Sequence, residues 1–238
     1  MSVPTSSAGA SPPAYYSRVN RPLLELLPPD LGAVLDVGCG AGALGRAYKE
    51  RFPASAWTGI EMAAEAATAA RAHLDHVIEA DAEFVDGSAL PEAAYDAIIY
   101  ADSLEHFRDP HSAVARHLRA VKPNGIVCAS LPNVQHWSAI LGLVSGRWDY
   151  RDEGLFDRTH LRFFTLDTMI EFFREAGCSV EAVVPLIPRS GAPLIPHWSQ
   201  HEAFMEHLRR IADTLHLRFD ERRFLAYQYV VRARWQGV

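Results

Sequence analysis

The stretch Ala33-Val34-Leu35-Asp36-Val37-Gly38-Cys39-Gly40-Ala41-Gly42 decides the fold of this chain. Its first five residues are mostly apolar and partly β-branched, which predicts a buried strand over 33–37. Three glycines at alternate positions end this strand, and residues 43–51 have the composition of a helix that stops before Pro53. A strand, a glycine turn and a helix in this order form the ligand-binding corner of an open α/β sheet.

Asp36 distinguishes between the ligands that such a corner can hold. A carboxylate two residues before the first glycine lies at the carboxyl end of the strand, where it repels a pyrophosphate and attracts a cation. Gly38, Gly40 and Ala43 also satisfy G-x-G-x-x-A, a pattern of nicotinamide-binding folds, so a dehydrogenase is the competing interpretation. The acid and the third glycine, Gly42, favour a cationic cofactor.

The same ten residues resemble the first motif of the class I S-adenosylmethionine-dependent methyltransferases, an acidic residue followed by x-G-x-G-x-G. The resemblance implies S-adenosylmethionine as the cofactor, whose sulfonium and ammonium groups are both cationic. It also implies the α/β class I methyltransferase fold, which is Rossmann-like, with a seven-stranded, mostly parallel sheet, an antiparallel last strand and helices on both faces. The cofactor-binding residues that it implies at this motif are Asp36, Gly38, Cys39, Gly40 and Gly42.

Apolar segments and turn signals predict the remaining elements. Strands are expected over 33–37, 56–60, 76–80, 95–100, 126–130, 179–184 and 224–235. Helices are expected over 15–27 (broken at Pro22), 43–51, 63–74, 111–121, 164–176 and 202–217, with a tight turn at 122–125. Five strands with four intervening helices predict a parallel, doubly wound sheet with right-handed crossovers. In the class I fold the last strand runs antiparallel between the fifth and sixth strands.

Further cofactor contacts are expected where the next three strands end. Glu61 ends the second strand about 20 residues after the glycine turn, where an acid accepts hydrogen bonds from ribose hydroxyls. Its alternative role is a negative charge at the start of the following helix. By the resemblance, Asp81 and Ala82 contact the adenine, although Asp81 by itself could cap a turn. Ala101 and Asp102 follow the fourth strand, where the resemblance places the methionine part of the cofactor.

A segment rich in histidine, arginine, aspartate and aromatic residues follows the fifth strand. Residues 133–164 are therefore predicted to form a substrate lid on the ligand-binding rim. The sequences LPNVQHWS and DRTHLRFFT within and beside it resemble a subgroup of class I methyltransferases often found with bacterial surface-polysaccharide glycosyltransferases, with methionine-biosynthesis protein W as a more distant relative. Candidate substrate-binding residues are Asn133, Trp137, Asp157, Arg158 and Arg162. The arginines suit a phosphate or carboxylate, or else salt bridges that hold the lid.

Three histidines are candidate catalytic residues. Methyl transfer from a sulfonium is an in-line displacement that depends mainly on proximity and alignment, and a base matters when the nucleophile is a hydroxyl or a protonated amine. The candidates are His106, His136 and His160; the alternatives are a packed or cofactor-wall role for His106 and an ion-pair network for His160. No metal site is predicted, because the other histidines considered share no common spacing: His73, His76, His197, His201, His207 and His216.

The predicted activity is methyl transfer from S-adenosylmethionine to a hydroxyl of a small polar metabolite or sugar, with N-methylation as the second choice. Nucleic acid is not an expected partner, because the formal net charge is −6 and the fourth strand is followed by Ala101-Asp102-Ser103-Leu104 instead of the [N/D/S]-P-P-[Y/F] motif. A further alternative is a non-catalytic protein that acts by pairing with another protein, whether or not it holds the cofactor.

Length and composition predict one cytoplasmic domain, and the subgroup resemblance implies a bacterial source. The 238 residues are 49% hydrophobic, enough for one substantial core over 15–238, while residues 1–14 are rich in Ser, Pro, Ala and Gly and are expected to be a disordered leader. The three scattered cysteines, Cys39, Cys128 and Cys178, indicate buried free thiols in a reducing compartment. No apolar run approaches the roughly 20 residues of a membrane helix.

Overall fold

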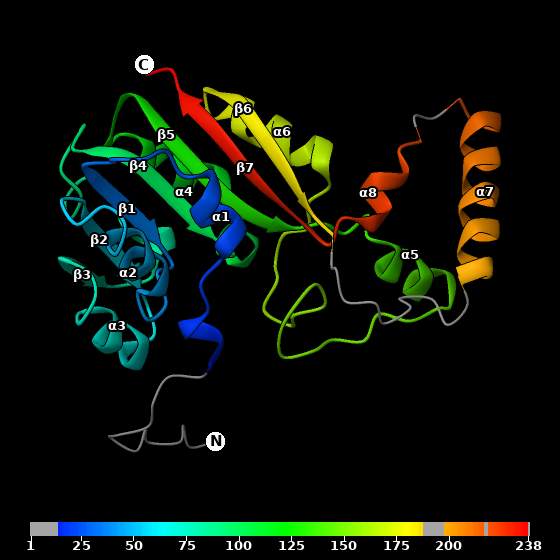
Figure 1. Ribbon diagram of the computed structural model, residues 1–238, viewed down its shortest axis with the longest axis horizontal. Coiled ribbons are helices and arrows are strands. Elements are labelled where there is room, and N and C mark those ends of the chain that lie inside the picture. The colour runs from blue at the N-terminus through cyan, green and yellow to red at the C-terminus, as the bar shows by residue number, and fades with distance from the viewer. Residues whose placement is uncertain (1–13, 188–197, 217–218, 238) are drawn as a thin grey trace.

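A seven-stranded sheet forms the centre of the computed structural model, which describes residues 14–187, 198–216 and 219–237 (Figure 1). The strands lie in the order β3-β2-β1-β4-β5-β7-β6. Their bounds are β1 Ala33–Val37, β2 Ala56–Glu61, β3 His76–Glu79, β4 Tyr95–Ala101, β5 Val121–Pro132, β6 Cys178–Leu186 and β7 Gln228–Trp235. The first five strands pair in parallel, and β7 is antiparallel to both of its neighbours, β5 and β6. The predicted class I methyltransferase fold is confirmed, whereas the predicted leader lies outside the described residues except for Ala14.

Helices cover both faces of the sheet. The α-helices are α1 Arg21–Leu26, α2 Ala43–Lys49, α3 Ala64–Ala70, α4 Pro110–Leu118, α5 Trp137–Val144, α6 Leu166–Glu175, α7 Trp198–Thr214 and α8 Glu221–Leu225; the 3-10 helices are η1 Ala14–Ser17, η2 Ala82–Phe84 and η3 Leu104–His106. Alternate strand residues face opposite ways, so Val34 and Ile99 pack with α1, α2 and α3, while Leu35 and Ile98 pack with α4 and α6. Strands buried on both faces explain the continuous apolar runs in the sequence.

Two expectations about helices are wrong. Pro22 does not break a helix over 15–27, because it occupies the first turn of the short helix α1. The amide hydrogen that proline lacks has no carbonyl partner in the first turn of any helix, so proline is tolerated there. Asn20 caps this helix by accepting a hydrogen bond from the amide of Leu23. Between β3 and β4 the described chain contains the 3-10 helix η2 and no α-helix, so the first five strands are linked by three α-helices instead of four.

The last strand and the tight turn also differ from expectation. The predicted strand over 224–235 begins only at Gln228, because residues 221–225 form α8, whose first turn is capped by the Asp220 carboxylate. Residues 122–125 do not separate a helix from a strand; they lie inside β5, where the pairing with β4 shifts between Tyr95 and Ala97. Asn124 has a left-handed φ of 63°, so the turn is accommodated as an irregularity of the strand.

The strand order places a crevice at the carboxyl ends of β1 and β4. The chain moves from β1 outward to β2 and β3, and then returns to the other side of β1 as β4. In an open parallel sheet, ligands bind at such a reversal of strand order. The turns at 38–42 and 102–106 follow β1 and β4, so both stand at this crevice.

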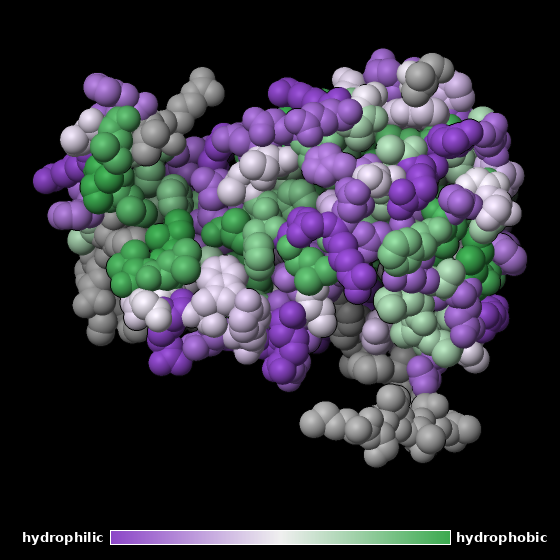
Figure 2. Space-filling view, turned by 180° about the vertical axis from the view of Figure 1, so that it is seen from behind, coloured by the Kyte–Doolittle hydropathy of each residue, from purple (hydrophilic) through white to green (hydrophobic). Residues whose placement is uncertain are grey.

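The predicted lid, residues 133–164, contains α5 followed by an irregular segment. Figure 1 shows α5, α7 and α8 beyond the end of the sheet, and Figure 2 shows apolar surface on the same side of the molecule. Exposed apolar side chains there include Leu143 and Val144 of α5, Ile211 of α7 and Leu215 directly after α7. In the described part of the chain, no helix has both the length and the apolar character to cross a membrane.

Gly45 provides a test of the packing behind the glycine turn. A Cβ added there would lie 2.4 Å from Leu74 Cδ2 and 2.8 Å from Cε3 of the fully buried Trp57. Helix propensity favours alanine over glycine by about 1 kcal/mol, whereas overpacking a core costs about 1–3 kcal/mol. We expect Gly45→Ala to lower the free energy of unfolding by about 1 kcal/mol, and by at most about 2 kcal/mol, in urea titrations. Gly87→Ala is the control, because nothing lies within 4 Å of its added carbon; greater stability of the Gly45 variant would contradict the packing argument.

Candidate functional site

The glycine turn after β1 has a backbone conformation that other residues rarely adopt. Gly38, Gly40 and Gly42 have φ values of 77°, 55° and 75°. A Cβ on Gly40 would lie 2.9 Å from the Tyr16 carbonyl oxygen, so the N-terminal segment passes directly over the turn. Cys39 contributes its backbone to the turn, while its buried side chain packs with α2 and α3, and burial raises the pKa of its thiol.

Asp36 places a buried carboxylate beside this turn. Its side chain is 1% exposed, and Oδ1 has no hydrogen-bond partner among the described residues. Burial, followed by the charge of Glu61, raises the pKa of Asp36 to about 7. A buried carboxylate without a partner is costly, so this position favours a cation or a hydrogen-bond donor.

Glu61, at the end of β2, joins the glycine turn to α3. Its Oε2 accepts a hydrogen bond from the Gly40 amide at 2.9 Å, and its Oε1 accepts one from the Ala63 amide at 2.8 Å. The helix-start role is therefore present in the structure. Each carboxylate oxygen can accept a second hydrogen bond, so Glu61 retains acceptor capacity for ribose hydroxyls.

Asp81 and Ala82 form the turn after β3. The Asp81 carboxylate accepts a hydrogen bond from the Glu83 amide at 3.0 Å and caps η2, so the turn-capping alternative is observed. The Ala82 carbonyl lies 2.9 Å from Nε2 of the buried His117. Burial lowers the pKa of His117 to about 4, so a neutral imidazole fixes this turn against α4.

Asp102 ties three segments to the end of β4, next to the half-buried Ala101. Its backbone is in the left-handed region, with φ 55°. Asn20 Nδ2 donates to Oδ2 at 3.2 Å, and the Gln228 side chain donates to Oδ1. Burial raises the pKa of Asp102 to about 6, against the opposing effect of hydrogen bonds from Asn20, Ser130 and Gln228. This carboxylate therefore has protein partners on both oxygens, unlike Asp36.

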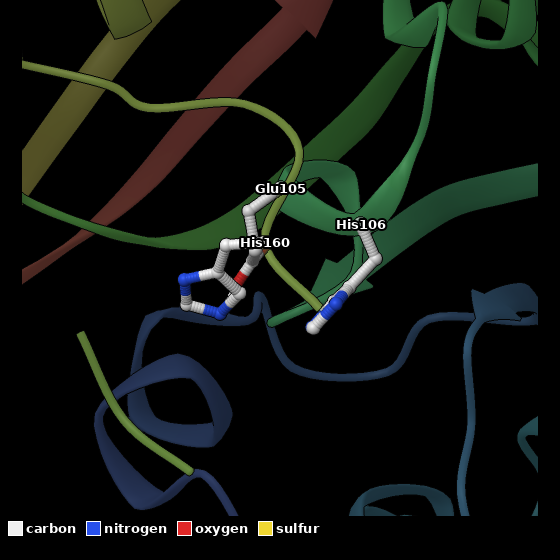
Figure 3. Close-up of side chains that lie close together, drawn as sticks. All are labelled: Glu105, His106 and His160. Atoms are coloured by element: carbon white, nitrogen blue, oxygen red, sulfur yellow. Dashed lines mark ion pairs between the residues drawn. The ribbon is translucent and has the colours of Figure 1, made fainter. Parts of the chain in front are cut away.

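Glu105, His106 and His160 converge on one point (Figure 3). Glu105 and His106 lie in η3, and His160 reaches them from the lid because the amides of Leu161 and Arg162 donate to the Glu105 carbonyl at 2.8 and 3.0 Å. The rings of His106 and His160 meet edge to face with centroids 4.8 Å apart. His160 Nε2 lies 4.0 Å from Glu105 Oε1. Two of the three predicted catalytic histidines are thus side by side.

Acidic groups surround this cluster, in which the side chains of Glu105 and His160 are buried and His106 is partly exposed. Burial, then the charge of Asp102 and also that of Asp157, raises the pKa of Glu105 well above its usual range. Burial lowers the pKa of His106, and burial together with the charge of His106 lowers that of His160. In the described structure, Glu105 Oε2 and His160 Nδ1 have no hydrogen-bond partner.

Thr159 and Asp157 orient the His106 ring. His106 Nδ1 lies 3.0 Å from Thr159 Oγ1 and 3.3 Å from the Thr159 carbonyl. The Thr159 hydroxyl donates to Asp157 Oδ1 at 2.6 Å, so Thr159 can only accept from the histidine. Nδ1 therefore carries the proton of the neutral ring, and Nε2 retains its lone pair.

His136 lies in a separate place, at the start of α5. Its Nδ1 is 2.7 Å from the Ser138 hydroxyl and caps the helix. Burial lowers the pKa of His136 to about 4. The ring packs against Trp137 and Tyr227, and the buried His136 Nε2 and Trp137 Nε1 are without partners in the described residues.

The other predicted lid residues already have partners within the protein. The buried Asn133 donates through Nδ2 to the carbonyls of Arg223 and Ala226 at 2.7 and 2.8 Å. Arg158 forms an exposed ion pair with Asp152 at 2.8 Å, so the salt-bridge alternative is observed for this arginine. The Arg162 guanidinium donates to the carbonyls of Arg108 and Leu161.

Glu105 and Ser103 are site residues that sequence reasoning did not select. The hydroxyl of buried Ser103 is unpartnered in the described chain, and its Cβ lies 3.0 Å from the position of a Cβ added to Gly38. Glu105 precedes the candidate His106 directly, and an acid beside a candidate histidine is the signal that would have identified it.

Comparisons with known proteins identify the family of this chain and its relatives. A family model described as "Methyltransferase domain" matches residues 14–183. The "Ubiquinone biosynthesis O-methyltransferase" of Hydrogenovibrio crunogenus is 31% identical over 152 residues, covering 60% of this chain and 61% of that relative's own length.

Two solved structures share the fold at low sequence identity. A methyltransferase of Thermotoga maritima described as "possible histamine N-methyltransferase" superposes with a TM-score of 0.60 at 16% identity, over 93% of this chain and 91% of that chain. The [4+2]-cyclase SpnF superposes with a TM-score of 0.59 at 21% identity, over 98% and 85%. Because a cyclase shares the fold, the fold alone does not specify the reaction.

Proposed function

Because the chain belongs to the methyltransferase-domain family, we propose that it is an S-adenosylmethionine-dependent enzyme that transfers a methyl group to a hydroxyl of a small polar molecule, a metabolite or a sugar. The observation that carries the proposal is the buried carboxylate of Asp36, whose Oδ1 has no hydrogen-bond partner among the described residues, beside a left-handed glycine turn. It provides an anionic position where a methionine-derived cation fits and a pyrophosphate does not. The curated relative is named an O-methyltransferase, which supports a hydroxyl as the acceptor.

The proposed cofactor site lies at the ends of β1 to β4. Asp36 would face the cationic methionine part, and Glu61 would accept hydrogen bonds from the ribose. The residues proposed to bind the cofactor are Asp36, Gly38, Cys39, Gly40, Gly42, Glu61, Asp81, Ala82, Ala101 and Asp102. When bound, S-adenosylmethionine supplies an electrophilic methyl group on sulfonium sulfur.

The proposed acceptor side is formed by the histidine cluster and the lid. His106 Nε2 retains a lone pair and would receive the hydroxyl proton as the acceptor oxygen bonds to the methyl carbon and the carbon–sulfur bond breaks. His160 would hold the acceptor beside it. His136 and the substrate candidates Asn133, Trp137, Asp157, Arg158 and Arg162 belong to the lid over residues 133–164; those with protein partners would act by positioning the lid.

Several finer expectations stay predictions. They are one domain over 15–238, a cytoplasmic enzyme, a small-molecule acceptor without nucleic acid, and the resemblance to the subgroup found with polysaccharide glycosyltransferases. An amine acceptor is the second choice, because the histidine cluster would equally take a proton from an ammonium group. If the protein binds the cofactor but transfers a methyl group to no acceptor, the alternative of a non-catalytic protein that pairs with another protein is favoured.

Cofactor identity can be tested by thermal unfolding. S-adenosylhomocysteine, the product form of the cofactor, is expected to stabilise the fold by about 2.7 kcal/mol at a hundredfold excess over Kd, whereas NAD is expected to have no effect. Glu61→Ala should reduce this shift, because it removes the proposed ribose acceptor. A shift with NAD and none with S-adenosylhomocysteine would refute the methyltransferase proposal in favour of a dehydrogenase.

Acceptor class is tested by release of S-adenosylhomocysteine during incubation with phenols, sugars and amines. The expected result is turnover with a hydroxyl compound. Turnover restricted to amines would replace the O-methyltransferase proposal by N-methylation, and the two outcomes differ in the mass spectrum of the methylated product.

A further inference from the structure

We propose that His136 and Trp137, at the start of α5, form a subsite for a carboxylate of the methyl acceptor, so that the acceptor is a hydroxy acid or a sugar acid. This assignment rests on the proposed function, because it concerns the molecule that receives the methyl group. Both residues follow the carboxyl end of β5, the strand next to β4 in the sheet. The subsite therefore stands beside the crevice and apart from the histidine cluster.

Three consecutive residues at this position have buried side-chain atoms without a partner. The atoms are Gln135 Oε1, His136 Nε2 and Trp137 Nε1, three of the nine such atoms in the described part of the chain. Buried polar groups nearly always have a hydrogen-bond partner, and each exception requires an explanation. A donor left without a partner destabilises the protein, and a bound ligand can remove this cost. The run of three indicates a place that a polar ligand completes.

The two ring nitrogens are both hydrogen-bond donors. The Ser138 amide can only donate, and it donates to His136 Nδ1, which therefore carries no proton. Burial lowers the pKa of His136 to about 4, so near neutral pH the ring is uncharged and has its proton on Nε2. The indole nitrogen of Trp137 is always a donor. Two neighbouring donors, on rings with centroids 5.1 Å apart, suit a ligand group that has two acceptor oxygens.

The surroundings of these donors favour an anionic group over a neutral carbonyl. His136 is the N-cap and Trp137 the first residue of α5, so both lie at the positive end of the helix dipole. The histidine cluster, in contrast, has the negative charges of Asp102 and Asp157 beside Glu105. An acceptor with a carboxylate would place this group at α5, away from the acidic side chains, and leave its hydroxyl for the histidine cluster.

The backbone that carries the two donors is held in place by hydrogen bonds. Asn133 donates through Nδ2 to the carbonyls of Arg223 and Ala226. Its Oδ1 accepts from the Gln135 amide at 3.1 Å, and its carbonyl accepts from the His136 amide at 3.0 Å. A loop fixed in this way orients its donors before a ligand arrives, which reduces the entropy lost on binding.

Tyr227 connects the subsite to the proposed cofactor site. Its ring meets the His136 ring edge to face, with centroids 5.3 Å apart. The next residue, Gln228, donates through its side chain to Asp102, where the methionine part of the cofactor is proposed to lie. Two consecutive residues at the start of β7 thus contact the two sites, which places both at the same edge of the sheet.

Helix α5 is packed lightly enough to admit a ligand. The structure describes every residue of this helix, and Ala139 alone among them is buried. Leu143 and Val144 are 61% and 77% exposed. Segments with few buried apolar contacts open locally at low cost in free energy. A shift of α5 would therefore expose the two donors to an entering acceptor.

The test compares hydroxyl compounds in pairs that differ in a carboxylate: glucuronate with glucose, and mandelate with mandelamide. Calorimetry measures the affinity of each compound for the full chain saturated with S-adenosylhomocysteine, and release of this product from S-adenosylmethionine measures kcat/KM. In at least one pair, the carboxylate member is expected to bind and react about 10–100-fold better, which is the effect of a hydrogen bond to a charged group.

Two variants remove one donor each. Trp137→Phe removes the indole N–H and keeps an aromatic ring, while His136→Asn removes the Nε2 donor and keeps a residue that caps helices. Each is expected to weaken binding of the carboxylate member at least about tenfold and that of its neutral partner less than about twofold. Trp148→Phe is the matched control, because it makes the same change on the same lid, where the Trp148 ring packs against Phe156 and Phe163.

The selectivity within a pair separates recognition from structural damage, which would weaken both members equally. Undetectable carboxylate binding, equal affinity within both pairs, or an equal loss for both members in Trp137→Phe would overturn the subsite. With a normal melting shift by S-adenosylhomocysteine and turnover of a neutral acceptor, the proposed function would still stand. Carboxylate binding that depends on Trp137, without a melting shift or turnover, would support the subsite and refute the proposed function. If His136→Asn does not fold, Trp137→Phe decides alone.

Discussion

His160→Ala is expected to lower kcat for methyl transfer about 10²–10⁴-fold, while the Kd for S-adenosylhomocysteine stays within about twofold. The His160 ring meets His106 and Glu105 on the acceptor side of the crevice, whereas the proposed cofactor contacts follow β1 to β4. Because the ring lies beside the proposed base His106, removing it is expected to disturb both the placement of the acceptor and its loss of a proton. Initial rates at varied acceptor concentration, with calorimetry for the cofactor, measure the two effects separately.

A purely structural role for His160 predicts a different result. If the ring only fixes the lid, the variant should raise KM and keep kcat near the wild-type value. Arg147→Ala is the matched control on the same lid, because its ion pair with Asp149 is exposed and contributes little. His106→Ala should repeat the kcat loss. Wild-type kcat in both histidine variants would show that proximity and alignment alone account for the rate.

The sheet was predictable because its strands are buried on both faces. Each of the first strands appears in the sequence as a short apolar run between turn residues, and the bounds of β1 were predicted to the residue. Local signals failed where one residue serves two purposes. Pro22 was interpreted as a helix breaker although proline also starts helices, and Phe224 was assigned to the last strand although it lies in the short helix α8.

The grouping of the proposed cofactor residues could also be predicted from sequence, since these residues directly follow strands whose ends must meet. The contacts that assemble the proposed acceptor side could not be predicted in this way. His160 reaches Glu105 through hydrogen bonds from the backbone amides of Leu161 and Arg162, and no local pattern encodes a contact between segments so far apart. Residue type was equally misleading for Asn133, which was assigned to substrate but donates its amide hydrogens to the backbone beside α8.

Asp36→Asn is expected to stabilise the cofactor-free protein at about pH 8 by up to a few kcal/mol. The pKa of Asp36 rises from 3.8 to about 7 because the carboxyl is buried and faces the charge of Glu61. A raised folded-state pKa contributes stability that is present below the unfolded pKa and lost as the pH rises through the folded pKa. Wild-type stability therefore falls between about pH 4 and pH 7, and the asparagine variant should lack this part of the pH dependence.

The same substitution is expected to weaken S-adenosylmethionine binding about 10–100-fold, since a buried hydrogen bond to a charged group contributes about 1.5–3 kcal/mol. Binding of the cationic cofactor favours the ionised carboxylate, so wild-type affinity should increase from about pH 5 to pH 7 and then level off. In the variant this increase should be absent. Isothermal titration across the pH range measures both effects. Adenosine is the ligand control, because it lacks the cationic amino-acid end and should bind both proteins equally.

Asp96→Asn provides the matched protein control, with the opposite sign. Asp96 lies at the start of β4; although burial alone would raise its pKa, hydrogen bonds from Lys122 and the Ala33 amide lower it. Its stabilisation is present above the unfolded pKa, so the Asp96 variant should be less stable at about pH 8 and bind the cofactor normally. If Asp36→Asn stabilises the fold but leaves the affinity for S-adenosylmethionine unchanged, the Asp36 carboxylate does not face the cofactor. The buried oxygen without a hydrogen-bond partner would then destabilise the fold without contributing to ligand binding. The main support for the proposed function would be lost.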